Sequence, residues 1–293
     1  MAKRIEQRHR KRKFILKSLL VLIILLLIVI AESFVKLYYV NSPALPKPPK
    51  IITANPVDLS QIIGFSKFRS CSGHDFSGKN DQGIIESGRS MKMYVIPDDS
   101  LKDKLHVIKI YAPFDGKIAF MFQEGGADRQ PSYQIYVQSA KQPDYALNFF
   151  HTDPLPGTKI GNKVNAGQLL AYAHVRGAAD FDIAFHRLDS GVLVQDIGGL
   201  FGMPFLPLPK YDYLMPFTNF LSPKVAAEYK AAGFNLDNMT ISKQYRDNHA
   251  CDFNAQPVDS DYQFLSGRTI NNMSGSHTQQ PLTTPAPNTQ PVQ

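Results

Sequence analysis

The sequence predicts a mainly β, antiparallel domain that is preceded by one N-terminal transmembrane helix and followed by a short helical extension. Three observations support this prediction. An uncharged apolar run lies near the N-terminus, short segments of alternating polar and apolar residues fill the middle of the chain, and helix signals are scarce among those segments. With 293 residues, the chain is long enough for one large domain or two small ones.

The transmembrane prediction rests on residues 18–31, SLLVLIILLLIVIA, which contain no charged side chain. Because Lys17 can extend its ammonium group toward the membrane surface, the apolar span reaches back to Phe14. A helix of about 18 residues is about 27 Å long, which is close to the thickness of a bilayer core. We therefore expect residues 14–35 to form a single-pass anchor.

The charges that flank this run predict its orientation. The basic residues 1–13 should stay in the cytoplasm, so the anchor would cross the cytoplasmic or inner membrane and place the rest of the chain in the extracytoplasmic or periplasmic space. The alternative is a cleaved signal peptide, since Val29 and Ala31 are small enough for a cleavage site.

The basic balance of the chain is confined to its N-terminus. The net charge is +7, and the first 17 residues, with eight Lys or Arg and one Glu, account for all of it. The rest of the chain holds 24 basic and 24 acidic residues. Nucleic-acid-binding domains concentrate positive charge on one face, so this balance gives no support for a nucleic-acid partner.

The segments on either side of the β domain have distinct compositions. Residues 36–55 contain four prolines within 41–50, which predicts a stiff, extended linker. Residues 266–293 are polar and rich in proline, which is typical of a disordered tail. The extension comprises residues 211–265, and a helix is predicted within it at 222–233.

That helix has recognisable start and stop signals. Ser222 is a suitable N-cap, Pro223 suits the first helical position, and Gly233 is able to end the helix. The β domain itself spans residues 56–210, and the Pro–Gly turn APFDG separates two of its strands. The expected strands lie within residues 106–122, 133–139, 145–151, 164–175 and 180–188.

Four stretches of this domain occur in the order of a known family. They are FRSCSGHDFSG at 68–78, IKIYAPFDGKIAFMF at 108–122, FFHTDPLPGTKIGNKVNAGQLLAYA at 149–173 and DFDIAF at 180–185. Together they resemble the lysostaphin/LytM-type zinc metallopeptidases, which cleave peptidoglycan cross-links. The resemblance implies a LytM-like β-sandwich or barrel-sandwich hybrid with a duplicated hybrid motif.

The residues at the family's active-site positions depart from its pattern, which is H-x-x-x-D, H-x-H and one further His. Asp75 matches the Asp of the first motif, but Cys71 stands at its His. Asp180 and Asp182 stand at the two His of the second motif, and His151 matches the further His as the candidate catalytic residue. A Cys/Asp/Asp set would be anionic and would weaken the Lewis acidity of zinc. We therefore expect a catalytically degenerate domain without a cofactor.

An active hydrolase is the alternative. A shifted register would make His74, Asp75 and Asp182 the metal ligands, with His151 nearby and Cys71 as an alternative metal position. Such a set would hold one divalent cation, either zinc or a harder ion such as calcium or manganese. This arrangement would imply a metal-dependent peptidoglycan endopeptidase.

Two cysteines and two histidines have further interpretations. Outside the cytoplasm Cys71 and Cys251 could form a disulfide, although sequence alone does not show that they approach each other, and two unpaired thiols are the alternative. We interpret His174 and His186 as surface or strand-end residues rather than ligands.

A third function class comes from the tripeptide Met91-Lys92-Met93, which matches the acceptor site of biotinyl or lipoyl carrier domains. The Gly–Val half-motif that normally precedes such a lysine is missing, so we keep the carrier only as an alternative. The function that we expect is binding. The chain would be a membrane-anchored extracytoplasmic domain, rather than an enzyme, that contacts peptidoglycan, other cell-envelope material or a partner protein.

Overall fold

A computed structural model describes residues 17–19, 50–125, 128, 130–176, 178, 180–187, 213–255 and 258–265 of the chain. The chain divides into two compact units, Met1–Ala44 and Leu45–Gln293. The described part of the first unit is residues 17–19, which are helical.

The predicted anchor, linker and tail fall mostly outside these ranges. The anchor at 14–35 is described at residues 17–19, the linker at 36–55 from residue 50 onward, and the tail at 266–293 nowhere. Within the described ranges, no helix is both long enough and apolar enough to cross a membrane. The anchor therefore stays a prediction.

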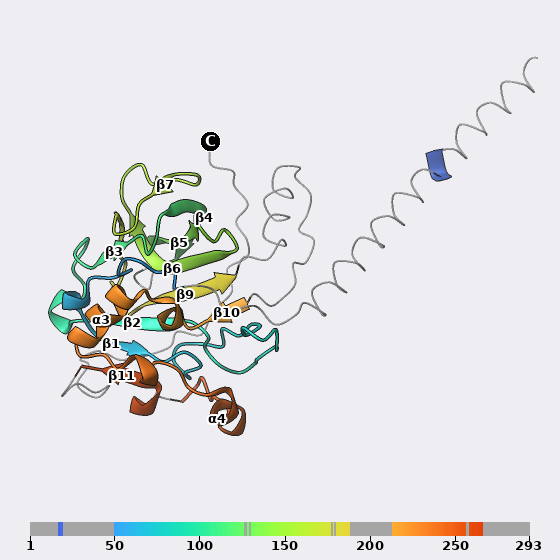
Figure 1. The fold of residues 1–293 in the computed structure, drawn as a ribbon, viewed down its shortest axis with the longest axis vertical. Helices are drawn as coiled ribbons and strands as arrows, with labels where there is room; N and C mark the ends of the chain where they lie inside the picture. Colours follow the sequence, from blue (N-terminus) through green and yellow to red (C-terminus); the bar gives the residue numbers. More distant parts are fainter. Residues whose placement is uncertain are drawn as a thin grey trace, which may run out of the picture. The chain divides into compact units, whose positions relative to one another are not determined.

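The second unit is built on one antiparallel sheet (Figure 1). The strands order as β11–β1–β2–β9–β6–β5–β4–β7, while β10 pairs with β9 and β8 pairs with both β3 and β6. Their bounds are β1 Ile62–Ser66, β2 Met93–Pro97, β3 Lys109–Tyr111, β4 Gly116–Gly125, β5 Pro131–Ser139, β6 Tyr145–Pro154, β7 Lys163–Val164, β8 Leu169–Ala173, β9 Phe181–Arg187, β10 Tyr213–Met215 and β11 Tyr262–Phe264. The prediction of a mainly β, antiparallel fold with few helices is confirmed.

The burial of the central strands explains why their sequences do not alternate between polar and apolar residues. In β9 the residues from Phe181 to His186 are all buried, and β6 is buried along its first six residues. Side chains such as Leu147, Phe149 and Ile183 join one large apolar cluster. A strand that is covered on both faces carries apolar residues almost continuously, whereas a half-exposed strand alternates. The two central strands are of the first kind.

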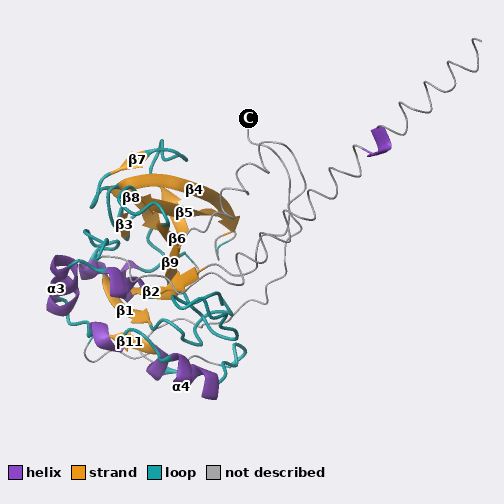
Figure 2. Cartoon of the chain, turned by 45° about the vertical axis from the view of Figure 1, so that its right-hand side comes forward, coloured by secondary structure: helices purple, strands orange, loops and turns teal. Residues whose placement is uncertain are grey.

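The C-terminal extension contributes helices and strands to the same fold (Figure 2). Helix α3 spans Pro223–Ala231, within the predicted range of 222–233, and helix α4 spans Lys243–Asn248. Ser222 caps α3, since its Oγ accepts a hydrogen bond from the backbone N–H of Val225 at 3.4 Å. Tyr229 of α3 packs its ring 5.8 Å from that of Phe65 in β1.

The extension is not separate from the β domain. β10 pairs with β9, and β11 pairs with β1, so strands from residues 211–265 complete the sheet. The sheet also includes strands that lie before the predicted strands of residues 106–188. β1 and β2 precede that stretch, and β2 pairs directly with β9 at the heart of the sheet.

Candidate functional site

Five side chains from separate parts of the chain meet beside β9, and we call them the Lys92 cluster. They are His74, Lys92, Glu124, His151 and Asp182. Lys92 directly precedes β2, and Asp182 belongs to β9, where it pairs in register with Tyr94 of β2. Strand pairing thus brings together residues that are about ninety positions apart in the sequence.

The ammonium group of Lys92 is the centre of the cluster. Its side chain is 3% exposed and forms an ion pair with Oδ2 of Asp182, which is 1% exposed. Nζ also lies 4.7–5.1 Å from three ring centroids, those of Phe76, Tyr94 and Phe150. Burying a charge is costly unless it is paired, and here a carboxylate and three aromatic faces compensate for the lost water.

His74 completes the contacts of this ammonium group. Its Nε2 lies 3.1 Å from Nζ of Lys92, and its Nδ1 lies 3.1 Å from the backbone oxygen of Asp75. A lysine ammonium is only a donor and a carbonyl only an acceptor. His74 therefore carries its proton on Nδ1 and accepts at Nε2. Burial and the charge of Lys92 both lower the pKa of His74, which favours this neutral form.

Two carboxyl groups at the start of β9 are neutralised in different ways. Burial acts to raise the pKa of Asp182, but Lys92 and then His151 outweigh it, and the pKa falls below its usual value. Burial, with the charge of Asp182, raises the pKa of Asp180 to about 7. Asp182 is thus an anion paired with a lysine, and Asp180 holds a proton at mildly acidic pH.

His151 and Glu124 form the solvent-facing end of the cluster. The backbone of His151 has a φ of 52°, a left-handed conformation that is unfavourable for a residue with a Cβ. Glu124 of β4 holds it there, because Oε1 accepts from the His151 backbone N–H at 2.6 Å and lies 3.2 Å from Nδ1. Nε2 of His151 lies 3.8 Å from Oδ1 of Asp182, and the side chain is 36% exposed.

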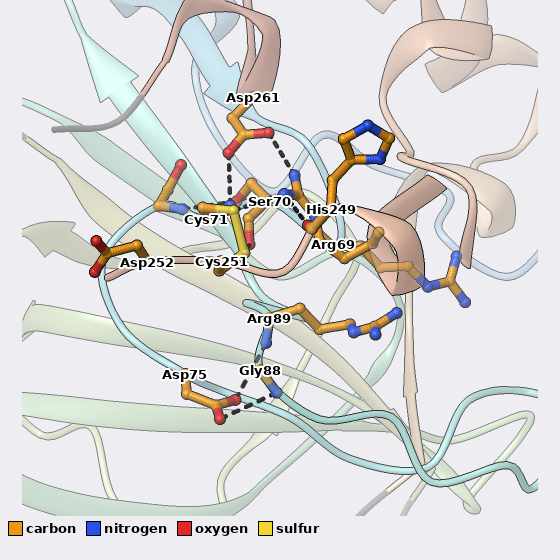
Figure 3. Close-up of a disulfide and its surroundings, with 12 residues drawn as sticks. Arg69, Ser70, Cys71, Asp75, Gly88, Arg89, His249, Cys251, Asp252 and Asp261 are labelled. Atoms are coloured by element: carbon orange, nitrogen blue, oxygen red, sulfur yellow. Dashed lines mark hydrogen bonds and ion pairs between the residues drawn. A yellow bond between two sulfur atoms is a disulfide. The ribbon is translucent and has the colours of Figure 1, made fainter. Parts of the chain in front are cut away.

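Asp75 does not join the cluster. Its carboxylate accepts from the backbone N–H groups of Gly88 at 3.2 Å and Arg89 at 3.4 Å (Figure 3). It also accepts from the hydroxyl of Ser77. It therefore serves its own loop. The shifted set of His74, Asp75 and Asp182 is not assembled, and the described residues contain no group of three or more His, Cys, Asp or Glu that would hold a metal.

Cys71 forms a disulfide with Cys251, with a Cα–Cα distance of 5.2 Å (Figure 3). Its sulfur therefore has no thiolate to offer a metal. Asp261 supports the link, because its carboxylate accepts from the Cys71 backbone N–H at 2.7 Å and from Nη2 of Arg246 at 2.6 Å. The bond joins the loop that carries His74 to the C-terminal extension.

Gly73 lets this loop lie against β2. Its φ is 66°, and a Cβ at this position would lie 1.8 Å from the Oη of Tyr94. No side chain fits in that space. The glycine therefore sets the distance between His74 and the strand that follows Lys92.

The sequence prediction named His74, His151 and Asp182 but missed the residues that tie them together. Lys92 was considered only as a carrier acceptor, and Glu124 was not considered. The position of Met91-Lys92-Met93 at the start of an apolar run was the available signal, but its pairing with the DFD strand is a tertiary feature. His174 and His186 lie at or near strand ends, which is one of the two predicted alternatives, and both are buried rather than on the surface.

No protein-family model, curated protein or solved structure matches this chain. The resemblance to the LytM-type peptidases therefore rests on the motifs described above.

Proposed function

We propose that the chain is a membrane-anchored, extracytoplasmic LytM-like domain, related to barrel-sandwich hybrids, that has lost peptidase activity and binds cell-envelope material or a partner protein. One observation carries this proposal. The ammonium group of Lys92 is paired with Asp182, the residue that the resemblance aligns with a zinc-binding histidine.

An ammonium ion in this place cannot perform zinc chemistry. A catalytic zinc holds a water molecule in an open coordination position and lowers the pKa of that water toward neutrality. Lys92 offers only N–H donors, and these face Asp182 and His74. The cluster therefore balances the charge of Asp182 without providing a nucleophile.

The same ammonium group disfavours a second cation. At a separation of about 4 Å and an effective dielectric constant of about 20, like unit charges repel by about 4 kcal/mol, and a divalent ion doubles this figure. One oxygen of Asp182 is paired with Lys92, and the other lies 3.8 Å from Nε2 of His151, which leaves few free donor atoms to offset such repulsion. The hydrolase alternative would require Lys92 to leave the cluster.

The carrier alternative is disfavoured because its acceptor lysine is buried. A carrier lysine must be exposed at a hairpin tip so that a ligase is able to reach it, whereas the Lys92 side chain is 3% exposed. The most accessible side chains of the cluster are those of His74 and His151, and Glu124 is partly exposed beside them, which favours binding as the function.

The test combines metal analysis, peptidoglycan hydrolysis and sedimentation with purified cell-wall sacculi, using the full chain. We expect less than a tenth of a metal ion per chain, no hydrolysis, and either cosedimentation or crosslinking to an envelope protein. One metal ion per chain, lost together with hydrolysis in Asp182→Ala, would overturn the proposal. Asp75→Ala is the matched control, because Asp75 lies outside the cluster.

The location has a separate test. A reporter enzyme fused after residue 265 should be active only outside the cytoplasm, and the protein should stay in the membrane fraction after an alkaline wash. A released mature form beginning near Glu32 would show that residues 14–35 are a cleaved signal peptide.

A further inference from the structure

His174 lies between two carboxylates at the end of β8. Its Nδ1 is 2.8 Å from Oδ1 of Asp153, and its Nε2 is 2.9 Å from Oδ1 of Asp128. The side chain is 3% exposed. The two acidic residues come from different elements, since Asp153 belongs to β6 and Asp128 lies between β4 and β5.

The geometry requires two protons on this imidazole. A neutral histidine has one N–H donor, and an ionised carboxylate is only an acceptor, so two short contacts to carboxylates call for the imidazolium form. Asp128 acts as an acceptor elsewhere as well, because the same Oδ1 accepts from the backbone N–H of Gln130 at 2.9 Å. Burial acts to lower the pKa of His174, but the hydrogen bonds to Asp128 and Asp153 outweigh it and raise the pKa.

Two other basic side chains, Arg176 and His106, also contact these carboxylates. Arg176, which follows on the same segment, lies 3.4 Å from Oδ2 of Asp128. His106, from the segment before β3, lies 3.8 Å from Oδ2 of Asp153 and is 62% exposed. Each touches the far oxygen of one carboxylate, whereas His174 is the group that joins the two.

This arrangement is connected to the Lys92 cluster through backbone. The N–H of His174 donates to the carbonyl oxygen of His151 at 2.7 Å. Asp153 follows His151 by two residues on β6, and Asp128 follows Glu124 by four. Glu124 in turn holds the backbone and the ring of His151. Asp128 and Asp153, which His174 bridges, therefore lie close in the sequence to Glu124 and His151, which form the solvent-facing end of the cluster.

We propose that His174 is a protonated clasp that fixes the Asp128 end of the β4–β5 hairpin to β6, in addition to the ladder by which β5 pairs with β6. Loss of its proton releases one carboxylate and loosens the contact between Glu124 and His151. His174 thus acts as a positioning residue. The proposal does not depend on what the chain binds, and its failure would leave the binding proposal untouched.

The direction of the pH effect follows from the proton count. The folded state binds the second proton of His174 more tightly than the unfolded state does. The clasp therefore contributes its full stabilisation below the unfolded pKa of about 6.5. That contribution is lost as the pH rises through the folded pKa.

The test uses the full chain labelled with ¹⁵N at histidine. Two-dimensional NMR should show both ring nitrogens of His174 protonated at pH 6 and one of them deprotonated at alkaline pH, with a midpoint above about 6.5. Amide exchange in the β4–β5 hairpin, corrected for its intrinsic pH dependence, should accelerate several-fold through the same midpoint. His174→Gln assigns the signal and should leave hairpin exchange fast and independent of pH.

His106→Gln is the matched control, because it changes another histidine beside Asp153 without removing the bridge. We expect the His174 midpoint and the exchange profile to persist in this variant. A neutral tautomer of His174 at pH 6, or hairpin exchange with the same pH profile in His174→Gln as in the wild type, would overturn the proposal. If His174→Gln fails to fold, the wild-type titration alone decides.

Discussion

Lys92 and His174 are two of the buried basic side chains in the described part of the chain, and these two residue types differ in how readily pH removes their charge. Lys92 faces Asp182 and His74, and His174 faces Asp128 and Asp153. A lysine beside a carboxylate stays charged across the physiological range, whereas histidine is the side chain whose charge changes there.

This difference indicates separate tasks for similar arrangements. Lys92 balances the charge of Asp182 through a buried ion pair, and we propose that it keeps a cation out of this place. The charge of His174 is conditional, so the contact that ties the Asp128 end of the β4–β5 hairpin to β6 is conditional too, whereas the ladder between β5 and β6 is not. The first arrangement defines a site, and the second regulates how firmly one side of that site is held.

The largest effect should come from removing the Lys92 ammonium group. Lys92→Met leaves the buried carboxylate of Asp182 without its partner, and breaking a buried ion pair in this way costs about 4 kcal/mol. Chemical denaturation should show this loss at pH 6 and a loss that is no smaller at pH 8, because burial raises the pKa of Asp182 once Lys92 is gone. In contrast, the loss caused by His174→Gln should shrink over the same interval.

Two further measurements sharpen this prediction. The double variant Lys92→Met/Asp182→Leu should recover most of the lost stability, because apolar residues often replace a buried ion pair at little cost. Added zinc should raise the melting temperature of Lys92→Met but not that of the wild type. An equal rise in both proteins would contradict the idea that Lys92 keeps a cation out.

The covalent support of the two arrangements also differs, since the loop that carries His74 is tied by the Cys71–Cys251 bond, which closes a sequence separation of 180 residues. The chain-entropy model gives about 5 kcal/mol as an upper value for such a loop, and typical measured values are about 2–4 kcal/mol. Cys71→Ser/Cys251→Ser should therefore lower the free energy of unfolding by about 3 kcal/mol. Labelling of the denatured, unreduced wild type should detect no free thiol at these two positions, and two free thiols would refute the bond.

The packing of the His74 loop has a matched pair of glycines. Gly73 and Gly88 have φ values of 66° and 65°, but a Cβ would clash with Tyr94 at the first and meet nothing within 4 Å at the second. Gly88→Ala should cost about 1 kcal/mol for its left-handed backbone alone. Gly73→Ala should cost about 2 kcal/mol more, because the clash forces the loop or Tyr94 to move. Chemical denaturation measures the free energy of unfolding of both variants. Equal losses would mean that the loop or Tyr94 moves away from the added Cβ at no cost.

The last prediction concerns Asp180, whose carboxyl group is neutralised by a proton at mildly acidic pH. Asp180 has a pKa raised to about 7, so its ionisation opposes folding increasingly between about pH 4 and pH 7. Asp180→Asn should be more stable than the wild type at pH 8 by about 1–2 kcal/mol. The gain is limited to this size because Asp180 is partly accessible to water, which screens its charge. The two proteins should converge near pH 4. A constant difference across this range would argue against titration of Asp180.

Much of the fold was readable from local patterns. The strands near residues 109–187 follow from β-type runs and Pro–Gly turns, and the start of α3 follows from Ser222 and Pro223. β1 and β2 were not predicted, because every residue of both strands is buried and their sequences therefore do not alternate between polar and apolar residues. β11 is short, and its partner β1 lies about 200 residues earlier.

For the candidate site, the sequence by itself supplied the chemistry of the individual residues. The resemblance to the LytM-type family places Cys71 at a histidine of one metal motif and Asp180 and Asp182 at the two histidines of another. The sequence also shows that His151 ends an apolar run and that Lys92 stands between two methionines. It did not show which of these groups meet. Residue type is a local property, and together with the resemblance it predicts that zinc chemistry is impaired.

Only the tertiary structure decided that Lys92 faces Asp182, that Asp75 caps its own loop, and that His174 bridges Asp128 and Asp153. These contacts depend on the register between β2 and β9 and on the packing of the β4–β5 hairpin against β6. Register sets which side chains of paired strands face one another, and no local pattern encodes it across about ninety residues. The physical reason is that a buried charge is stable only beside a partner, and long-range strand pairing selects that partner.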